Sequence, residues 1–198
     1  MVIKAIIFDC FGVFIGNPYK IRIQALDATD PQKAESLREI NRASDRGFIT
    51  REETAREMAR IIGITQEELL AEQDKGEVRN DELVEYARTL RGDYKVAMLS
   101  NIGSRGRLDL RFGEGVLDEL FDVVVPSGEV GFIKPEPEIY QVTIDKLGVL
   151  PEECVMIDDI LEFCQGAEAV GMHAIQYFSN EQAIADLQAL IDRGGERL

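Results

Sequence analysis

Several residue types are scarce in this chain of 198 residues, and each scarcity argues against a class of protein. Tryptophan is absent, histidine occurs once, and the three cysteines show no CxxC spacing, so neither a disulfide framework nor a zinc site is indicated. No apolar run approaches the roughly 20 residues that a membrane span needs, and the opening residues lack the cleavage region of a signal peptide. We therefore expect a cytoplasmic protein without a membrane span.

Basic residues are also in short supply. The chain has 22 lysines and arginines against 37 aspartates and glutamates, which gives a net charge of −15. Such a field repels nucleic acid and anionic membranes, so neither is expected as a partner. A small anionic substrate is still compatible with this charge, because a nearby lysine and a bound cation outweigh a screened surface field at short range. The sequence leaves the oligomeric state open.

Apolar residues, in contrast, make up 45% of the chain and gather in five short segments. These segments are continuously apolar rather than alternating, which is typical of parallel strands that are covered on both faces. Helices are expected between and after the later apolar segments, at residues 136–147, 161–170 and 180–192. Residues 193–198 are expected to form a frayed end. The pattern predicts an α/β fold with a doubly wound, Rossmann-like, five-stranded parallel sheet, its strands at residues 2–8, 95–99, 121–125, 154–157 and 173–178.

The interval between the first two strands contains roughly 80 residues and no convincing strand, which is too long for a simple crossover. Helix starts within it are well marked: Asp30 precedes a proline, Thr50 and Thr65 each open a capping box, and Asn80 precedes an acidic first turn. We therefore expect an inserted small helical-bundle cap at residues 17–91. Residues 1–16 and 92–198 would then form the α/β core.

Polar residues follow the first two predicted strands directly. Asp9 comes at the end of the first, just before Gly12, and the second ends in Ser100 and Asn101. The carboxyl ends of parallel strands meet at one edge of the sheet, where open α/β folds bind ligands. A serine hydroxyl and nearby backbone N–H groups suit the oxygens of an anion. Taken singly, Asp9 is equally compatible with the cap of a turn, and a Ser-Asn pair is more often a turn or a helix cap.

Charged residues mark the later part of the same edge. Lys134 lies in a proline-stiffened loop ahead of a helix, where its ammonium can project toward a ligand. Asp158 and Asp159 close the fourth strand as adjacent carboxylates, which repel each other unless a cation or hydrogen-bond donors offset the charge. Hard oxygen ligands of this kind suit Mg²⁺. The alternative role for the pair is to cap the following helix.

Taken together, these motifs resemble the haloacid dehalogenase (HAD) superfamily of hydrolases. Phe-Asp-x-x-Gly-Val, Leu-Ser-Asn, Lys-Pro-x-Pro-x-Ile-Tyr and Ile-Asp-Asp occur in the order found in that superfamily, and the resemblance spans residues 3 to about 178. The helical insertion is similar to the first type of cap in the superfamily, which closes over the active site. The resemblance thus implies a Rossmann-like hydrolase core with a lid.

The resemblance also implies roles for the matching residues. Asp9 would be the nucleophile, Ser100 and Lys134 would hold the transferred group and its charge, and Asn101 and Gly12 would contact the substrate. Mg²⁺ would be the cofactor, held by Asp9, the backbone carbonyl of Phe11, Asp158 and Asp159. A carboxylate nucleophile forms an ester or acyl-phosphate intermediate that water then cleaves. The favoured function is therefore a Mg²⁺-dependent phosphatase that acts on a small phosphorylated metabolite through an aspartyl-phosphate.

One position departs from the pattern. Phosphatases of this superfamily carry a second aspartate two residues after the nucleophile, as general acid and base, but here that position is Phe11. General acid–base help is worth about 10²–10⁴-fold in rate. Two alternatives therefore stay open. One is a 2-haloacid dehalogenase-like hydrolase that works through an aspartyl ester and needs a cap arginine, for which the candidates include Arg22, Arg38 and Arg42; the other is a catalytically weak protein that binds small anions.

Overall fold

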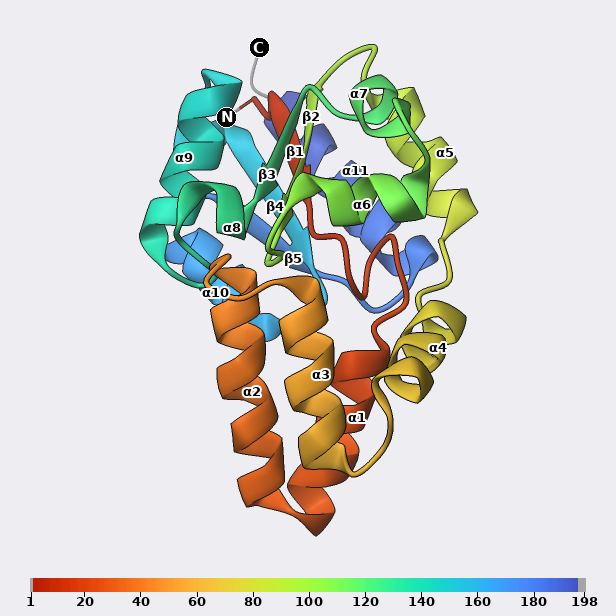
Figure 1. Ribbon diagram of the computed structural model, residues 1–198. Helices are drawn as coiled ribbons and strands as arrows, with labels where there is room; N and C mark the ends of the chain where they lie inside the picture. Colours follow the sequence, from red (N-terminus) through yellow and green to blue (C-terminus); the bar gives the residue numbers. More distant parts are fainter. Residues whose placement is uncertain (1, 196–198) are drawn as a thin grey trace.

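The computed structural model describes residues 2–195, and within that range five strands form one parallel sheet, as the sequence predicts (Figure 1). The strand order is β3-β2-β1-β4-β5, so the first strand in the chain lies at the centre of the sheet. This order leaves β2, β1 and β4 as neighbours with their carboxyl ends at one edge. The strands are β1 (Ala5–Phe8), β2 (Lys95–Ser100), β3 (Val123–Pro126), β4 (Cys154–Asp158) and β5 (His173–Gln176).

The central strand β1 is buried at every residue and is paired on both sides. Ile7 lies between Ala97 of β2 and Met156 of β4. Alternate side chains enter two different hydrophobic clusters: Ile6 packs into the cluster on one face of the sheet, and Ile7 into the cluster on the other. The continuous apolar run is therefore explained by burial on both faces.

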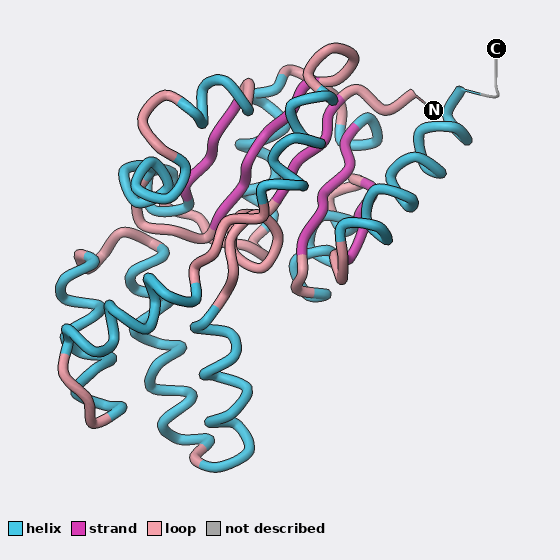
Figure 2. The backbone as a smooth tube through the Cα atoms, turned by 90° about the vertical axis from the view of Figure 1, so that its right-hand side faces the viewer, coloured by secondary structure: helices cyan, strands magenta, loops and turns pink. Residues whose placement is uncertain are grey.

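Helices cover both faces of the sheet and complete the doubly wound core (Figure 2). One face carries α5 (Asp81–Leu90), α6 (Arg105–Phe112), α7 (Val116–Leu120) and α11 (Asn180–Gly195), whose buried residues share one cluster. The other face carries α8 (Ser127–Val130), α9 (Pro137–Leu147) and α10 (Leu161–Ala169), and a short 3₁₀ helix, η1 (Pro151–Glu153), precedes β4. Residues 193–195, which the sequence placed in a frayed end, belong to α11, and residues 196–198 of that end lie outside the described part of the chain.

Four further helices form a bundle beyond the carboxyl edge of the sheet (Figure 1). They are α1 (Pro18–Thr29), α2 (Pro31–Asp45), α3 (Arg51–Ile62) and α4 (Gln66–Gly76). The bundle has a hydrophobic cluster of its own, which includes Leu37 of α2 and Leu69 of α4. The predicted caps are confirmed: the Asp30 side chain accepts from Lys33 N, and both threonine capping boxes are complete. The segment 18–76 is thus locally stabilised and packs around its own centre.

Helix α5 differs from the sequence-based expectation. Asn80 caps it as predicted, but its buried residues join the cluster of the sheet and not that of the bundle. They are Leu83, Val84, Ala87 and Leu90. Helical periodicity defines which stripe of a helix is apolar, not which element covers that stripe. The bundle therefore ends before residue 81, and the division of the chain into core and cap as separate domains stays a prediction.

The cysteines and the hydropathy of the helices agree with the sequence analysis as far as the described residues test it. All three cysteines are buried free thiols. Within residues 2–195, every helix is too short or too polar to traverse a lipid bilayer.

Candidate active site

Asp9 is placed by the first residues after β1. Its backbone N–H donates to the carbonyl of Ile157 at 2.9 Å, which extends the pairing with β4 by one residue. The chain then turns back sharply, because the N–H groups of Phe14 and Ile15 both donate to the Cys10 carbonyl. Asp9 is 5% exposed and lies at the carboxyl edge of the central strand. The sequence-based placement of this side chain is therefore confirmed.

Lys134 joins two of the predicted acidic residues. Its Nζ donates to Asp9 Oδ1 at 2.7 Å and to Asp158 Oδ2 at 2.6 Å. The lysine side chain is completely buried, and the Asp158 side chain is too. Residues 125 and 24 positions apart in the chain thus meet in one charged contact.

Asn101 holds this lysine in position. Its side-chain oxygen accepts from Lys134 N at 2.8 Å, and its Nδ2 donates to Lys134 O at 3.0 Å. The side chain that the sequence assigned to substrate binding therefore fastens the Lys134 loop to the end of β2. Contact between Asn101 and a substrate stays a prediction.

Three carboxylates converge beside Lys134. Asp9, Asp158 and Asp159 each place an oxygen within 4.8 Å of the others. Burial raises the pKa of Asp9 to about 7, although Lys134 acts to lower it. Burial alone would lower the pKa of Lys134, but the Asp158 and Asp9 carboxylates outweigh this and hold it above its ordinary value. Lys134 is thus a stable cation, and the cluster still carries an excess of acidic groups.

The donor set at this cluster fits a hard divalent cation. Oδ1 of Asp159 is buried without a hydrogen-bond partner in the part of the chain that the structure describes, and so is Oγ of Ser100. Buried polar atoms are rarely left without partners, so each such atom is a candidate ligand contact. The Phe11 carbonyl accepts a hydrogen bond from Asn17 Nδ2 at 3.3 Å and keeps a second lone pair. An oxygen-rich cluster of this kind matches the preferences of Mg²⁺.

Gly12 has a steric role in this arrangement. Its φ of +102° is rarely adopted by residues with a side chain. A Cβ on Gly12 would also lie 2.3 Å from Asp159 Oδ2. The turn therefore needs glycine here so that the backbone can lie against the Asp159 carboxylate. Its predicted contact with a substrate stays untested.

Phe11 lies at a cavity of about 80 Å³ between the sheet edge and the bundle. The guanidinium of Arg107 lies over its ring, 5.2 Å from the ring centroid. Asn101 also lines this cavity, as does Asp45 from the last turn of α2. The position that bears an aspartate in superfamily phosphatases is thus occupied by an aromatic ring that packs under an arginine.

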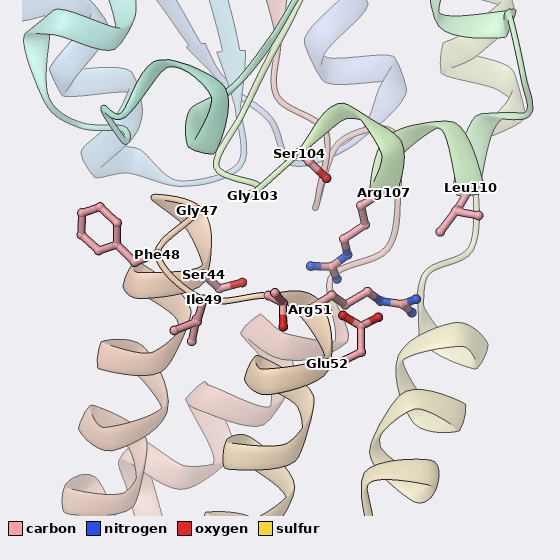
Figure 3. A pocket seen from close by; sticks show the side chains of 11 residues that line it. Ser44, Gly47, Phe48, Ile49, Arg51, Glu52, Gly103, Ser104, Arg107 and Leu110 are labelled. Carbon is pink, nitrogen blue, oxygen red and sulfur yellow. The ribbon is translucent and has the colours of Figure 1, made fainter.

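A wider cavity of about 470 Å³ adjoins the first (Figure 3). It lies between the loop that joins α2 to α3 and the start of α6, and Arg107 lines both cavities. In Figure 3, Arg107 points from the core toward the bundle, with Arg51 on the opposite wall. Arg107 thus forms a wall that the two cavities share.

Sequence reasoning missed several polar residues of the site. Lys20 of α1 donates to the Asp159 backbone carbonyl and, at 2.5 Å, to its Oδ2. Asn17, Asp45 and Arg107 reach the same region from three different elements. Only Asn17 had a usable signal, because an asparagine before a proline marks a helix start. The others have no spacing in the sequence that sets them apart from surface residues.

The three cap arginines proposed for a dehalogenase lie elsewhere. Arg38 pairs with Asp27, Arg42 pairs with Glu35, and Arg22 pairs with Glu72. None of these three lines the cavity at Phe11 in the region that the structure describes. The structure thus does not bring the predicted cap arginines to the nucleophile.

Comparison with known proteins identifies the family of this chain. Residues 3–171 match the haloacid dehalogenase-like hydrolases. Among curated proteins, phosphatase MT3486 of Mycobacterium tuberculosis is 31% identical over 112 residues, which cover 51% of this chain and 50% of that protein. The chain spans half or less of the length of the curated relatives that it matches first.

Solved structures show the same fold. A predicted HAD-like hydrolase from Porphyromonas gingivalis is 28% identical, with a TM-score of 0.72 and coverage of 96% of this chain and 98% of that one. A HAD family enzyme from Bacteroides thetaiotaomicron, in complex with magnesium and inorganic phosphate, has a TM-score of 0.70 at 23% identity, with coverage of 90% and 96%. The α/β core and the helices that follow β1 therefore belong to a known architecture.

Proposed function

This chain belongs to the haloacid dehalogenase-like hydrolases, and we propose that it removes the phosphoryl group from a small phosphorylated metabolite. The observation that carries the proposal is the contact of Lys134 with Asp9 and Asp158 in a buried cluster with a third carboxylate, Asp159. A phosphoryl group carries negative charge on several oxygens. It therefore requires a nucleophile next to fixed positive charge, which this cluster supplies.

Asp9 is the proposed nucleophile. Its carboxylate oxygen attacks phosphorus, a new P–O bond forms to Asp9, and the bond from phosphorus to the leaving oxygen breaks. Water then attacks the same phosphorus, which releases inorganic phosphate and regenerates the carboxylate. Lys134 keeps its charge throughout and stabilises both the ionised Asp9 and the phosphoryl oxygens. Ser100, whose buried hydroxyl has no partner among the described residues, would donate to one of these oxygens.

Mg²⁺ is the proposed cofactor. Asp9, Asp158, Asp159 and the Phe11 carbonyl would hold it, and when bound it would offset the excess negative charge of the cluster and of the phosphoryl group. Lys20 occupies one oxygen of Asp159, so this carboxylate has Oδ1 available for a cation. The support is the donor set itself, together with the magnesium and phosphate in the related Bacteroides enzyme.

The substrate is proposed to be a small phosphate ester. The cavity at Phe11 and the wider cavity beside it offer space for an organic group next to the proposed phosphoryl site, and Arg107 lines both cavities. The name of the Mycobacterium relative supports a phosphatase. Three buried free thiols support a reducing compartment such as the cytoplasm.

Phe11 favours a second candidate, a 2-haloacid dehalogenase-like hydrolase, because a departing halide needs no proton. The contacts of Arg22, Arg38 and Arg42 argue against it, since all three form ion pairs with acidic residues of the bundle. The phosphatase is therefore the proposal that accounts for more of the observed contacts.

The test is product release by the purified chain from a panel of phosphate esters and 2-haloacids, with and without Mg²⁺. Asp9→Asn is the blank, and Asp145→Asn on the exposed surface of α9 is the matched control. We expect phosphate release that requires both Mg²⁺ and Asp9. Halide release would replace the proposal with the dehalogenase, and no Asp9-dependent product from either class would replace it with anion binding.

A further inference from the structure

The acid that is missing at Phe11 has a counterpart in the same cavity. Asp45 ends α2 and lines the cavity of about 80 Å³ together with Phe11, Asn101 and Arg107. We propose that Asp45 of the helical bundle is the general acid and base of the reaction, in the place that Phe11 leaves without a carboxyl group. This inference rests on the phosphatase function proposed above. It assigns to the bundle a group that touches the leaving oxygen of the substrate.

The surroundings of Asp45 keep a proton on its carboxyl group. The residue is 8% exposed, and its Oδ2 accepts from Asn41 Nδ2 at 2.7 Å. Within residues 2–195 it forms no ion pair with a lysine or arginine. A buried carboxyl group without a cationic partner is favoured in its neutral form. Burial raises the pKa of Asp45 to about 8, against the lowering effects of Arg107 and Lys134.

The core fixes the position of Asp45, although the residue belongs to the bundle. Ser127, the first residue of α8, donates its hydroxyl hydrogen to the Asp45 carbonyl. The next residue, Arg46, forms an ion pair with Glu136 and donates to the Gly131 carbonyl at 3.3 Å. Three contacts with the core therefore fasten the end of α2 beside the sheet edge. A catalytic acid needs a fixed position of this kind.

Other titratable groups face the same cavity, and they are engaged differently. Glu77 accepts from Arg107 at 3.0 Å and from Arg111 at 2.6 Å, so its carboxylate is already neutralised by two cations. The charged and titratable groups that act on Asp45 from neighbouring elements are Arg107 of α6, Lys134 of the loop before α9, Asp9 after β1 and Tyr19 of α1. Of the two carboxyl groups that line this cavity among the described residues, Asp45 is thus the one without a cationic partner.

The proton balance follows from these contacts. As Asp9 bonds to phosphorus and the leaving oxygen departs, the Asp45 proton moves to that oxygen, so the leaving group departs as an alcohol. Asp45 is then an anion, stabilised by the Asn41 amide and by Arg107 nearby. It accepts a proton from the water whose oxygen attacks phosphorus. Release of phosphate restores the carboxylate of Asp9 and the protonated Asp45.

The test compares two leaving groups in wild type and Asp45→Asn. An alkyl phosphate needs protonation of its leaving oxygen, whereas 4-nitrophenyl phosphate does not, and kcat/KM for both reports transfer to Asp9. We expect Asp45→Asn to lower kcat/KM by about 10²–10⁴-fold for the alkyl ester and by less than about tenfold for the nitrophenyl ester. A burst of nitrophenol should appear in the variant, because the second step loses its base. Thr54 also lines this cavity. Thr54→Val, which removes no acid, should change kcat/KM for the two substrates by the same factor.

Equal losses with both substrates would show that Asp45 only supports the structure, and no loss with the alkyl ester would overturn its catalytic role. A second measurement needs no variant: kcat/KM of the wild type for the alkyl ester should fall as pH rises past about 8, while that for the nitrophenyl ester should not. Parallel pH profiles would overturn the proposal. Absence of any Asp9-dependent phosphate release is a different outcome, because it overturns the phosphatase function itself.

Discussion

The sheet core and the four-helix bundle each contribute a lysine to the same acidic cluster, and the two lysines differ in their exposure to solvent. The core contributes Lys134, whose ammonium is wholly buried between two carboxylates. The bundle contributes Lys20, whose side chain is 35% exposed and contacts one carboxylate. A desolvated cation is held by strong electrostatic contacts, whereas a solvated one exchanges them for water at little cost. The core thus supplies the buried cation of the acidic cluster, and the bundle supplies a second, partly solvated cation at its edge.

The hydrophobic packing of the two regions shows a similar contrast. The sheet is covered by two extended clusters that involve helices on both faces. The bundle relies on one small cluster, while its outer surface carries many exposed ion pairs. Surface ion pairs contribute little to stability. The bundle is therefore expected to be the less stable region, which suits a segment that would open for substrate entry.

The largest expected difference is between substitutions of the two lysines. Lys134→Met leaves Asp9 and Asp158 buried without their cation, and breaking a buried pair in this way costs about 3–5 kcal/mol. Without Lys134 the pKa of Asp9 rises further, so the folded state holds a proton that the unfolded chain has lost. The stability that Lys134→Met loses relative to wild type should therefore be larger at pH 8 than at pH 5. Urea unfolding at both pH values measures it.

Lys146→Met, on the exposed side of α9, is the control and should change stability by less than about 0.5 kcal/mol. Millimolar Mg²⁺ should restore part of the stability that Lys134→Met loses. A loss of the same size at both pH values would argue against uncompensated carboxylates.

A second pair of substitutions asks whether the two regions unfold separately. Leu99 of β2 and Leu37 of α2 are both fully buried, one in the sheet and one in the bundle. Each leucine-to-alanine change should cost about 2–5 kcal/mol locally. We expect Leu99→Ala to speed amide hydrogen exchange in both regions, and Leu37→Ala to speed it in α1–α4 while the strands stay protected. Equal effects on the strands would show a single cooperative unit and contradict the predicted domains.

The third prediction concerns the pH dependence of stability. Between the ordinary aspartate pKa of about 4 and the raised value of about 8, folded Asp45 keeps a proton that the unfolded chain has released. Stability of the wild type should therefore fall as pH rises through this window, by at most about 1.4 kcal/mol per pH unit from this group. Asp45→Asn lacks this contribution and should gain stability relative to wild type from pH 5 to pH 8. Parallel stability curves would contradict a protonated Asp45.

Among the substitutions at the acidic cluster, Lys20→Met has the smallest expected effect. Because this lysine is partly solvated, its loss should change stability by less than about 1 kcal/mol, and less still at high salt. The same substitution frees Asp159 Oδ2 and should tighten Mg²⁺ binding, measured by calorimetry. A destabilisation as large as that of Lys134→Met would remove the contrast between the two lysines.

Much of the core could be predicted from the sequence, because its signals are local. Continuous apolar runs identify β1 and β4, and polar residues directly after them identify Asp9 and Asp158 as neighbours at one sheet edge. The capping boxes at Thr50 and Thr65 likewise depend on four consecutive residues. Such features need no knowledge of tertiary packing.

The rest of the site could not be predicted, because it arises where separate elements pack. Asp45 differs from any surface aspartate only through its burial at the end of α2, and Lys20 is distinguished only by where α1 lies. Asn101 was correctly placed at the end of β2, but its hydrogen bonds with Lys134 depend on a loop 33 residues later. The sequence shows the apolar stripe of α5, but it does not show that this stripe packs against the sheet and not against the bundle.

The central position of β1 has a consequence for synthesis of the chain on the ribosome. The neighbours of β1 are β2 and β4, which emerge long after it. At elongation rates of 5–20 residues per second, the nascent strand waits on the order of ten seconds for β2. During that interval α1–α4 can form from local contacts, while the apolar segment from Ala5 to Phe8 has no partner. The insertion after β1 therefore prolongs the exposure of an aggregation-prone segment to chaperones.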